Sequence, residues 1–518
     1  MPKIVFLWTD VALFALLISA VIYGWRVSKS VNSRATWARV LQQAPAMCSA
    51  VVLSFFVLVG ILDSIHLQLR LQTSESISTS ASTTTASSAS TSTSTSGAQS
   101  VVYSPEVVSL LDVLLADTAL LHKEKTYSAP LAWRQFTKES ILQEGGQTHR
   151  DFPRLKFGGR HLDDPETQWL NDVLVRGSLG LAAGVAIGLG LMGWLVWMLM
   201  RAQRKRNPNE SARITYSDVW HDVWKGVYKT PWRAMLITVF LMAMIIGVTF
   251  GLASGYHVLG SDRTGNDVLW QALKSIRTAW VIGSLTTVAM LPVAILFGVT
   301  AGYFKGWVDD VIQYIYTTLT SIPGVLLIAA CVLMMQVYID THADLFPTSA
   351  QRADLRLFLL CMILGLTGWA GLCRLLRAEV LKLRELEYVQ AAKAFGVSNL
   401  RIMLRHLLPN LMHIILITLV LEFSGLVLYE AVLSYLGIGV DPTMNSFGTM
   451  IDKSRLEMSR DPMIWWTLLS AFVFMLTMVL AANLFADGVR DAFDPRSRVL
   501  RPRRFRRRAA TQSVEKTL

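Results

Sequence analysis

The sequence predicts an all-α polytopic membrane protein, and three observations support that prediction. Of its 518 residues, 52% are hydrophobic and only 17% are charged, whereas soluble domains carry about a quarter charged residues. The hydrophobic residues form long blocks instead of lining one face of each helix. Nine of these blocks reach the roughly 20 residues that a helix needs to cross a bilayer. Because the bilayer core offers the backbone no hydrogen-bond partners, blocks of this length must be helical.

The nine blocks predict nine membrane spans, and the charges between them predict an orientation. Cytoplasmic loops carry an excess of Lys and Arg. Basic residues concentrate in 26–45, 201–233 and 379–410, and eight arginines follow in 496–508. These four segments lie on one side only if the N-terminus is outside and the C-terminus is cytoplasmic. The spans are expected at 4–25, 46–65, 178–200, 234–258, 278–303, 310–336, 356–378, 411–433 and 464–486.

The first part of the chain contains a long segment between the second and third spans, which this orientation places outside. Its residues 73–100 are almost all Ser, Thr and Ala, a composition typical of a flexible, solvated tether. The tripeptide Ser104-Pro105-Glu106 is typical of a helix start, so an amphipathic helix is expected over Val107–Leu121. The predicted divisions are 1–65 (two spans and a basic cytoplasmic loop), 66–177 (external segment) and 178–233 (a third span and a basic linker).

Signatures of catalysis and of cofactor binding are absent from the sequence. It has no G-x-x-x-x-G-K-[ST] phosphate loop and no H-E-x-x-H, and its nine His residues lack metal-ligand spacing. No catalytic residue, cofactor or metal is therefore expected. Ser254 and His257 raise the alternative of an intramembrane serine protease. The glycine spacing does not fit that class, and Gly251–Gly255 is better explained as a small-residue patch for close helix contact.

The most informative loop lies between the predicted spans 356–378 and 411–433. A short amphipathic helix is expected to end at Gly396, followed by a second helix and by Pro409 where the next span begins. Ala391 and Ala392 are small enough for a partner surface to approach closely. Charge alone would fit an ordinary cytoplasmic loop, but the order of small residues, glycine and Leu408-Pro409 is more specific.

In that loop, residues 390–409 resemble the EAA loop of the permease subunits of binding-protein-dependent ABC importers, with Gln390 replacing the usual Glu. The ending His406-Leu407-Leu408-Pro409-Asn410 is similar to the dipeptide, oligopeptide and nickel branch of that family. Four more segments resemble motifs of this branch in the same order: 259–268, with Ser261 and Asn266 as departures, then 301–309, 430–440 and 487–496.

The resemblance implies a six-helix type I ABC importer permease core over 234–496, preceded by three extra spans and followed by a basic tail, 497–518. It also implies a bacterial inner-membrane protein that pairs with a second permease subunit, two ABC ATPase subunits and an external solute-binding protein. The chain itself would hydrolyse nothing, and its solute would be a peptide or another small solute of this branch. The implied ATPase-coupling residues are Gln390, Ala391, Ala392, Gly396, His406, Leu408 and Pro409.

Two acids in or near the eighth span are candidates for the transport pathway, because a charge inside a membrane is costly and is usually functional. Glu422 lies deeper and is the better candidate, although a paired structural acid is an equal alternative. Glu430 lies near the outer end, where a structural hydrogen bond is at least as well supported as solute contact.

Two further alternatives concern the tail and the whole chain. The arginine-rich tail is typical of a cytoplasmic terminus attracted to acidic membrane lipids, and this interpretation is favoured over nucleic-acid binding. The rival function is a membrane sensor or scaffold with a degenerate permease core. The departures at Gln390, Ser261 and Asn266 favour it, whereas the intact Gly396 and Pro409 oppose it.

Overall fold

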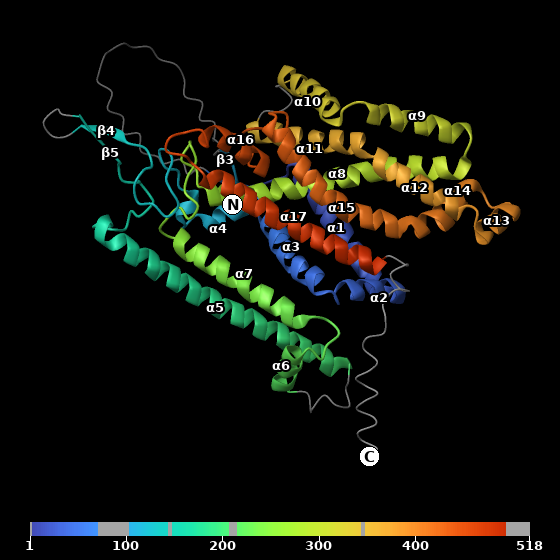
Figure 1. The fold of residues 1–518 in the computed structure, drawn as a ribbon, viewed down its shortest axis with the longest axis horizontal. Helices are drawn as coiled ribbons and strands as arrows, with labels where there is room; N and C mark the ends of the chain where they lie inside the picture. The colour runs from blue at the N-terminus through green and yellow to red at the C-terminus, as the bar shows by residue number, and fades with distance from the viewer. Residues whose placement is uncertain (1–2, 71–102, 143–147, 207–214, 343–347, 494–518) are drawn as a thin grey trace, which may run out of the picture.

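The computed structural model is almost entirely helical (Figure 1). It describes residues 3–70, 103–142, 148–206, 215–342 and 348–493. The predicted tether 73–100 and tail 497–518 lie outside these residues. The elements before the predicted core are β1 (Lys3–Val5), α1 (Trp8–Lys29), α2 (Val31–Val40), α3 (Ala44–Asp63), β2 (His66–Arg70), β3 (Tyr103–Ser109), α4 (Leu110–Leu115), a 3-10 turn (Ala119–Leu121), β4 (Glu139–Leu142), β5 (Thr148–Asp151), α5 (Pro165–Arg206) and α6 (Tyr216–Lys225).

The second half of the chain contains the helices of the predicted core. They are α7 (Trp232–Ala253), α8 (Val268–Phe304), α9 (Trp307–Ser321), α10 (Gly324–Thr341), α11 (Ser349–Gly368), α12 (Ala370–Leu383), α13 (Glu387–Ala394), α14 (Asn399–Ile402), a π-helical turn (Met403–Leu407), α15 (Leu408–Tyr435), α16 (Phe447–Glu457) and α17 (Trp466–Phe493).

Within the described residues, eight helices are long and apolar enough to cross a membrane. They are α1, α3, α5, α7, α8, α10, the continuous run from α14 through α15, and α17. The pair α11 and α12, which is bent by 41°, makes a ninth when the two helices are counted as one span. The nine predicted spans correspond to these helices except at one place.

The prediction of a single span over 310–336 is wrong in its bounds. The helix breaks after Ser321, where Ile322 takes an extended backbone ahead of Pro323, and only α10 qualifies as a span. Proline disfavours helical geometry at the residue before it, which explains the break. Figure 1 shows α9 and α10 following one another in the same direction, so together they make one crossing.

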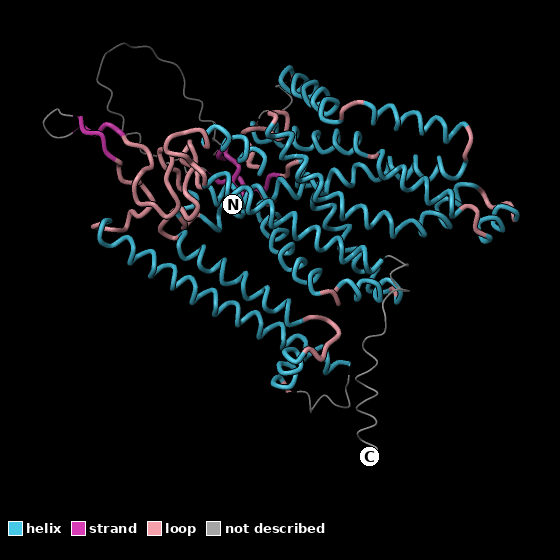
Figure 2. The backbone as a smooth tube through the Cα atoms, viewed as in Figure 1, coloured by secondary structure: helices cyan, strands magenta, loops and turns pink. Residues whose placement is uncertain are grey.

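The helices have two distinct ends (Figure 2). At one end β1, β2 and β3 form an antiparallel sheet that joins the start of α1 to the end of α3. We call this the sheet end. At the opposite end lie α2 and the turn from α12 through α13 into α15, which we call the α13 end. Successive crossings alternate in direction between these ends (Figure 1).

The helix predicted over Val107–Leu121 is wrong at its start. Tyr103–Ser109 is the strand β3, which pairs with β2, and the helix begins only at Leu110. Ser109 is the better cap, because its hydroxyl accepts from the Asp112 N–H at 3.2 Å while the Asp112 carboxylate accepts from the Ser109 N–H at 3.1 Å. Pro105 fits in β3 because this is an edge strand.

The helix pair α5 and α7 packs through glycine. Gly180 and Gly184 on α5 face Gly247 and Gly251 on α7 so closely that an added Cβ at any of them would collide with the backbone of the other helix. Small residues permit such close approach in membranes. The interpretation of Gly251 as part of a helix-contact patch is therefore confirmed.

Candidate functional site

The segment between α12 and α15 forms a compact projection at the α13 end of the molecule (Figure 1). Gly396 follows α13 with φ of +72°, so the predicted need for a left-handed residue at this position is confirmed. The Val397 N–H donates to the Ala392 carbonyl at 3.1 Å, and the Gly396 N–H donates to Lys393 at 3.1 Å. No heavy atom would meet a Cβ at Gly396 within 4 Å, so its backbone conformation, not lack of space, requires glycine.

This projection is anchored on α8 and α12. Val389 is buried in a cluster that includes Ile402 and Leu407. The Tyr303 hydroxyl, near the end of α8, donates to Asn399 Oδ1 at 2.8 Å, and Arg384 Nη1 donates to the Tyr303 carbonyl at 2.6 Å. The segment is therefore held at a defined position relative to the membrane helices.

The outer face of the projection exposes apolar side chains. Phe395 is 87% exposed, Leu400 63% and Leu404 57%. Ala391 is also exposed, whereas Ala392 is partly buried against the cluster around Val389. The two alanines predicted to face a partner thus have different surroundings, and only Ala391 lies fully on the outer face.

Of the remaining predicted coupling residues, Gln390 lies at a small cleft. Gln390 borders this cleft of about 160 Å³ together with Tyr303, Arg384 and Lys393. Its Nε2 donates to the Arg384 carbonyl at 3.0 Å, a bond that the Glu usual in the family could not donate while ionised.

His406, Leu408 and Pro409 form the entry to α15. His406 is partly buried with its ring centroid 6.4 Å from that of Tyr388, and Leu408 packs against the Val389 cluster. Pro409 is exposed and has no N–H to donate to the carbonyl four residues earlier. The π-helical turn Met403–Leu407 lies immediately before it, which accommodates the missing bond.

The two candidate pathway acids differ sharply. Glu430 is 1% exposed and accepts from the Ser434 hydroxyl at 2.6 Å, next to the start of α16. This environment favours the structural alternative. Glu422, at the middle of α15, is exposed, and no hydrogen bond or ion pair engages its carboxylate in the described part of the chain. A Cβ added at nearby Gly425 would meet no atom within 4 Å, so there is open space beside this part of α15.

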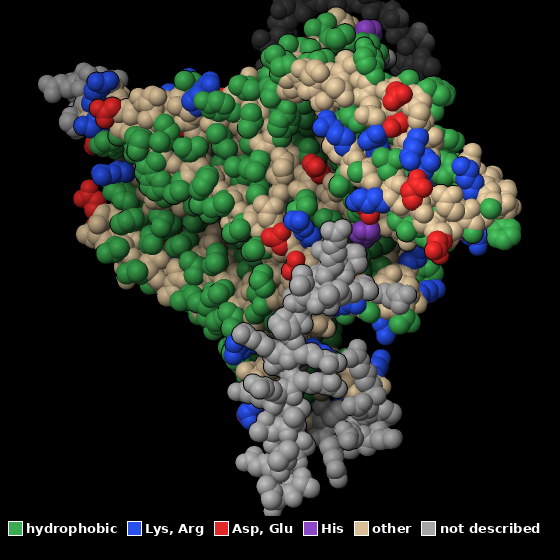
Figure 3. All heavy atoms as spheres, turned by 45° about the vertical axis from the view of Figure 1, so that its right-hand side comes forward, with side chains coloured by type: hydrophobic (Ala, Val, Ile, Leu, Met, Phe, Trp, Pro, Cys, Tyr) green, Lys and Arg blue, Asp and Glu red, His purple; other side chains and the backbone are tan. Residues whose placement is uncertain are grey.

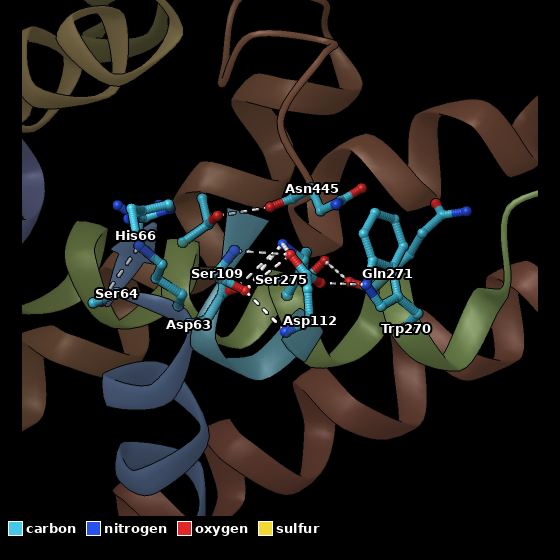
Figure 4. A network of polar contacts seen from close by, with 12 residues as sticks. Asp63, Ser64, His66, Ser109, Asp112, Trp270, Gln271, Ser275 and Asn445 are labelled. Carbon is cyan, nitrogen blue, oxygen red and sulfur yellow. Dashed lines mark hydrogen bonds and ion pairs between the residues drawn. The ribbon is translucent and has the colours of Figure 1, made fainter. Parts of the chain in front are cut away.

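A buried ionic cluster at the sheet end was missed by the sequence analysis. Arg277 on α8 lies 2.5 Å from Asp10 Oδ1 on α1 and 3.6 Å from Asp354 Oδ1 on α11. One turn away, Lys274 pairs with Asp112 at 2.7 Å and with Asp63 at 3.3 Å. Figure 4 shows these two acids at the sheet end, with Asp112 beside Ser109. Asp10 and Asp63 fall inside predicted apolar spans, and this was the signal that could have revealed the cluster.

The segment 66–177, which the sequence predicts to be external and which we call the external segment, is attached to the loop between α7 and α8 by a second buried cluster. His257 Nδ1 lies 2.7 Å from Asp267 Oδ2, and its Nε2 lies 3.5 Å from Glu124 Oε1. Burial disfavours the charged ring, but the hydrogen bonds to Asp267 and Glu124 outweigh it and raise the pKa of His257 to about 9.

Glu124 is the acid that the external segment contributes to this cluster. Burial alone would raise the pKa of Glu124, but hydrogen bonds from His257 and from the backbone N–H groups of Gly158, Lys156 and Phe157 lower it to about 2. The segment between α7 and α8 thus holds the external segment through charged groups that are buried on both sides.

The motif at 259–268 forms a turn that starts α8. Asp262 Oδ1 accepts from the N–H groups of Thr264 and Asn266, each at 2.9 Å, and Asp267 caps α8 by accepting from the Trp270 N–H at 3.0 Å. The hydroxyl of Ser261, one of the two residues that differ from the family motif, donates to the Thr126 carbonyl at 2.9 Å. Ser261 therefore attaches the external segment to this turn.

Ser254 is not activated by a base. Its hydroxyl donates to the Gly251 carbonyl and accepts from Arg176 Nη1, both at 2.8 Å. His257 is instead engaged by Asp267 and Glu124. This geometry does not fit the alternative of a serine protease.

Comparison with known proteins identifies relatives for the second half of the chain. Residues 294–499 match the family described as the binding-protein-dependent transport system inner membrane component. The chain is 34% identical to the oligopeptide transport system permease protein OppC of Mycobacterium tuberculosis, over 47% of this chain and 78% of that protein. It is 26% identical to the dipeptide transport system permease protein DppC of Bacillus subtilis, over 58% of this chain and 93% of that protein.

Proposed function

Because the chain belongs to the family of inner membrane components of binding-protein-dependent transport systems, we propose that it is a permease subunit of an ATP-driven peptide importer. It is a multi-pass membrane subunit and not an enzyme. Its relatives are named as oligopeptide and dipeptide permeases, which supports peptides as the solute. The alternative of a sensor with a degenerate core is not favoured, since the motif residues around Asp262 and Gly396 form ordered turns.

The observation that supports coupling is the exposed apolar face of an otherwise anchored projection. Large side chains such as Phe395 are rarely left in water without a partner, and exposed aromatic residues are favoured anchors at interfaces. The projection enters a cleft of an ATPase subunit, with Phe395 and Leu400 as apolar anchors. Tyr303, Asn399 and Arg384 then transmit ATPase closure to α8 and α12.

Substitution of Phe395 tests this proposal. We expect Phe395→Ala to weaken association with the ATPase by more than about 2 kcal/mol, the scale of an interface hot spot. The measurement is co-purification of the ATPase, together with solute-stimulated ATP hydrolysis in proteoliposomes. Trp307→Ala is the matched control, because Trp307 is an exposed aromatic residue near the same end but outside the projection. Equal effects of the two substitutions would refute the assigned docking face.

The complete transporter then contains this chain, a second permease subunit, two ABC ATPase subunits and an external solute-binding protein. The α13 end faces the cytoplasm and the sheet end faces outward. The charge distribution supports this orientation: Figure 3 shows Lys and Arg side chains gathered toward the α13 end and a broad hydrophobic face beside them. The basic tail interacts with acidic lipids on the cytoplasmic side.

Glu422 lines the transport path between the two permease subunits. Its exposure at the middle of a span would place a charge in lipid, which is costly, unless a polar path or partner covers it. A carboxylate there suits the ammonium group at the N-terminus of a peptide. Glu430, buried and hydrogen-bonded to Ser434, supports the fold of the outer end of α15.

A further inference from the structure

An apolar groove of about 570 Å³ runs between α3, α5 and α7, away from the coupling projection and from Glu422. Its volume falls within the about 300–1,000 Å³ typical of small-molecule sites. Val51 and Phe55 of α3 form one wall. The other walls come from α5, among them Leu179, Ala183 and Leu191, and from α7, among them Val239 and Phe250.

The groove follows from the way the three helices pack. Glycines bring α5 and α7 into backbone contact, so these two helices form a rigid pair. Figure 1 shows this pair diverging from the other helices with distance from the sheet end. The space beside α3 is therefore left without protein side chains to fill it, and it lies along stretches that are apolar enough to be inside the bilayer.

One end of the groove is polar and carries the guanidinium of Arg176, which is paired with Asp172. Arg176 and Ser254 line it at the sheet end, where Arg176 Nη1 donates to Ser254 Oγ at 2.8 Å. Arg176 Nε donates to Asp172 Oδ2 at 2.9 Å, and this carboxylate also accepts from the Tyr256 hydroxyl at 2.8 Å. The guanidinium is thereby fixed at the mouth, although about a quarter of its side chain stays exposed.

The depth of the groove matches a lipid chain. It extends along α5 from Arg176 to Leu191, which is roughly 22 Å at about 1.5 Å per residue, within a hydrocarbon core of about 30 Å. Arg176 stands just before the apolar stretch that begins near residue 178, at the level of lipid headgroups. A molecule that fits is apolar over most of its length and has at one end an oxygen-rich group, such as a phosphate, that can accept hydrogen bonds from the partly exposed guanidinium of Arg176.

We propose that this groove binds one phospholipid, with an acyl chain along α5 and α7 and its phosphate at Arg176 and Ser254. The lipid fills the space between the α5–α7 pair and α3 and holds the pair against the rest of the molecule. This site is independent of solute transport and of ATPase coupling.

The test uses the full-length protein reconstituted in nanodiscs containing equal parts of phosphatidylglycerol and phosphatidylcholine, then released into detergent for native mass spectrometry. The wild type should retain one lipid, with phosphatidylglycerol enriched about fivefold, the factor expected for one basic residue near a membrane surface. Ala183→Phe fills the groove and should abolish retention. Ala182→Phe is the matched control, since Ala182 is also exposed on α5 but does not line the groove.

Further variants separate the two parts of the site. Arg176→Gln should keep a lipid but lose the preference for phosphatidylglycerol, and Arg176→Lys should restore part of it. Val51→Phe fills the groove from α3 and replaces Ala183→Phe if that variant fails to insert. Retention of the lipid by both filled variants would overturn the proposal, as would an unchanged headgroup preference in Arg176→Gln. Release of the lipid by inorganic phosphate alone would show an anion site without a chain-binding groove and would also overturn it.

Discussion

Gly396 has a backbone conformation that residues with side chains rarely adopt. Its φ of +72° ends α13 and turns the chain toward α14. A β-branched residue in this region costs about 1–2 kcal/mol, so the turn must rearrange to avoid the strain. The effect on function is expected to come from displacement of Phe395, because no atom near Gly396 would clash with a new side chain.

Gly396→Val should therefore insert normally but lose co-purification of the ATPase and solute-stimulated ATP hydrolysis. Gly396→Asn should retain most of both activities, since Asn tolerates the left-handed region. Gly371→Val on α12 is the control. A Cβ added at Gly371 would also meet no atom within 4 Å, but Gly371 has an ordinary helical φ. If Gly396→Val behaves like this control, the turn is not part of the coupling element.

Glu422 provides a second prediction at the level of one side chain. Loss of a hydrogen bond to a charged group costs about 1.5–3 kcal/mol, so Glu422→Gln should slow uptake of peptides with a free N-terminal ammonium by about tenfold or more. Uptake of N-acetylated peptides should change little. The measurement is uptake into proteoliposomes, with Glu166→Gln, an exposed acid at the start of α5, as control. An equal loss for both peptide classes would argue that Glu422 does not contact the ammonium.

Glu422 and Glu430 show which properties of a site can be predicted from the sequence and which cannot. Glu422 and Glu430 were recognisable as candidates because both are charged within an apolar stretch. Which of them is buried depends on the packing of α16 against α15, which brings Gly448 against Glu430. Arg277 is a similar case: its partners Asp10 and Asp354 lie far from it in the sequence, on α1 and α11, and only the fold brings the three together.

At the level of whole elements, length and hydropathy predicted the spans well where the chain runs straight. They failed where a proline or a helix bend interrupts an apolar stretch. Pro323 breaks the predicted span over 310–336, and the bend at Trp369 divides 356–378 into α11 and α12. The strand β3 was also missed, because its pairing with β2 crosses a long separation in sequence.

The stability of the contact between the external segment and the loop before α8 should depend on pH. The pKa of His257 is raised from 6.5 to about 9, so its contribution is complete below pH 6.5 and is lost as the pH rises through 9. The pKa of Glu124 is lowered from 4.5 to about 2, so its contribution is complete above pH 4.5 and is lost as the pH falls through 2. The contact should therefore be most stable between about pH 4.5 and 6.5. On the alkaline side it should lose roughly 3 kcal/mol of stabilising free energy at most.

Hydrogen exchange of residues 119–142, corrected for the intrinsic effect of pH, measures this loss. Protection should fall between pH 6.5 and 9 in the wild type. His257→Gln should lower protection at neutral pH and remove the alkaline dependence. His122→Gln changes a partly exposed histidine in the same segment and should leave that dependence in place. A wild-type profile that is flat over this range would contradict the assigned role of His257.

At the level of the whole molecule, the first 233 residues are joined closely to the predicted core. Asp10 on α1 pairs with Arg277, Asp63 on α3 pairs with Lys274, and α5 packs along α7 through glycine. The division into an extension and a core stays a prediction from motif positions. Loss of Asp10 would leave Arg277 buried with Asp354 as the remaining acid at ion-pair distance in the described residues, so the first span supports the predicted core at the sheet end.

The orientation of the whole chain in the membrane is the last prediction. With nine crossings, β1 at the sheet end and the end of α17 at the α13 end lie on opposite sides of the membrane, and the basic residues of the α13 end favour the cytoplasm. Probes of orientation must lie at exposed positions on opposite ends. Asp163 and Ser398 meet this condition, whereas Ser90 in the predicted tether lies outside the described residues. Single cysteines at these positions are introduced after replacement of the four natural cysteines with alanine.

In right-side-out vesicles, a membrane-impermeant maleimide should label Asp163→Cys directly and Ser398→Cys only after permeabilisation. Labelling of both positions after permeabilisation controls for reactivity. Immediate labelling of Ser398→Cys would place the coupling projection outside, where no ATP-driven subunit could reach it. Because Gly396, Phe395 and Ser398 belong to one rigid turn, that result would refute the orientation and the coupling role together.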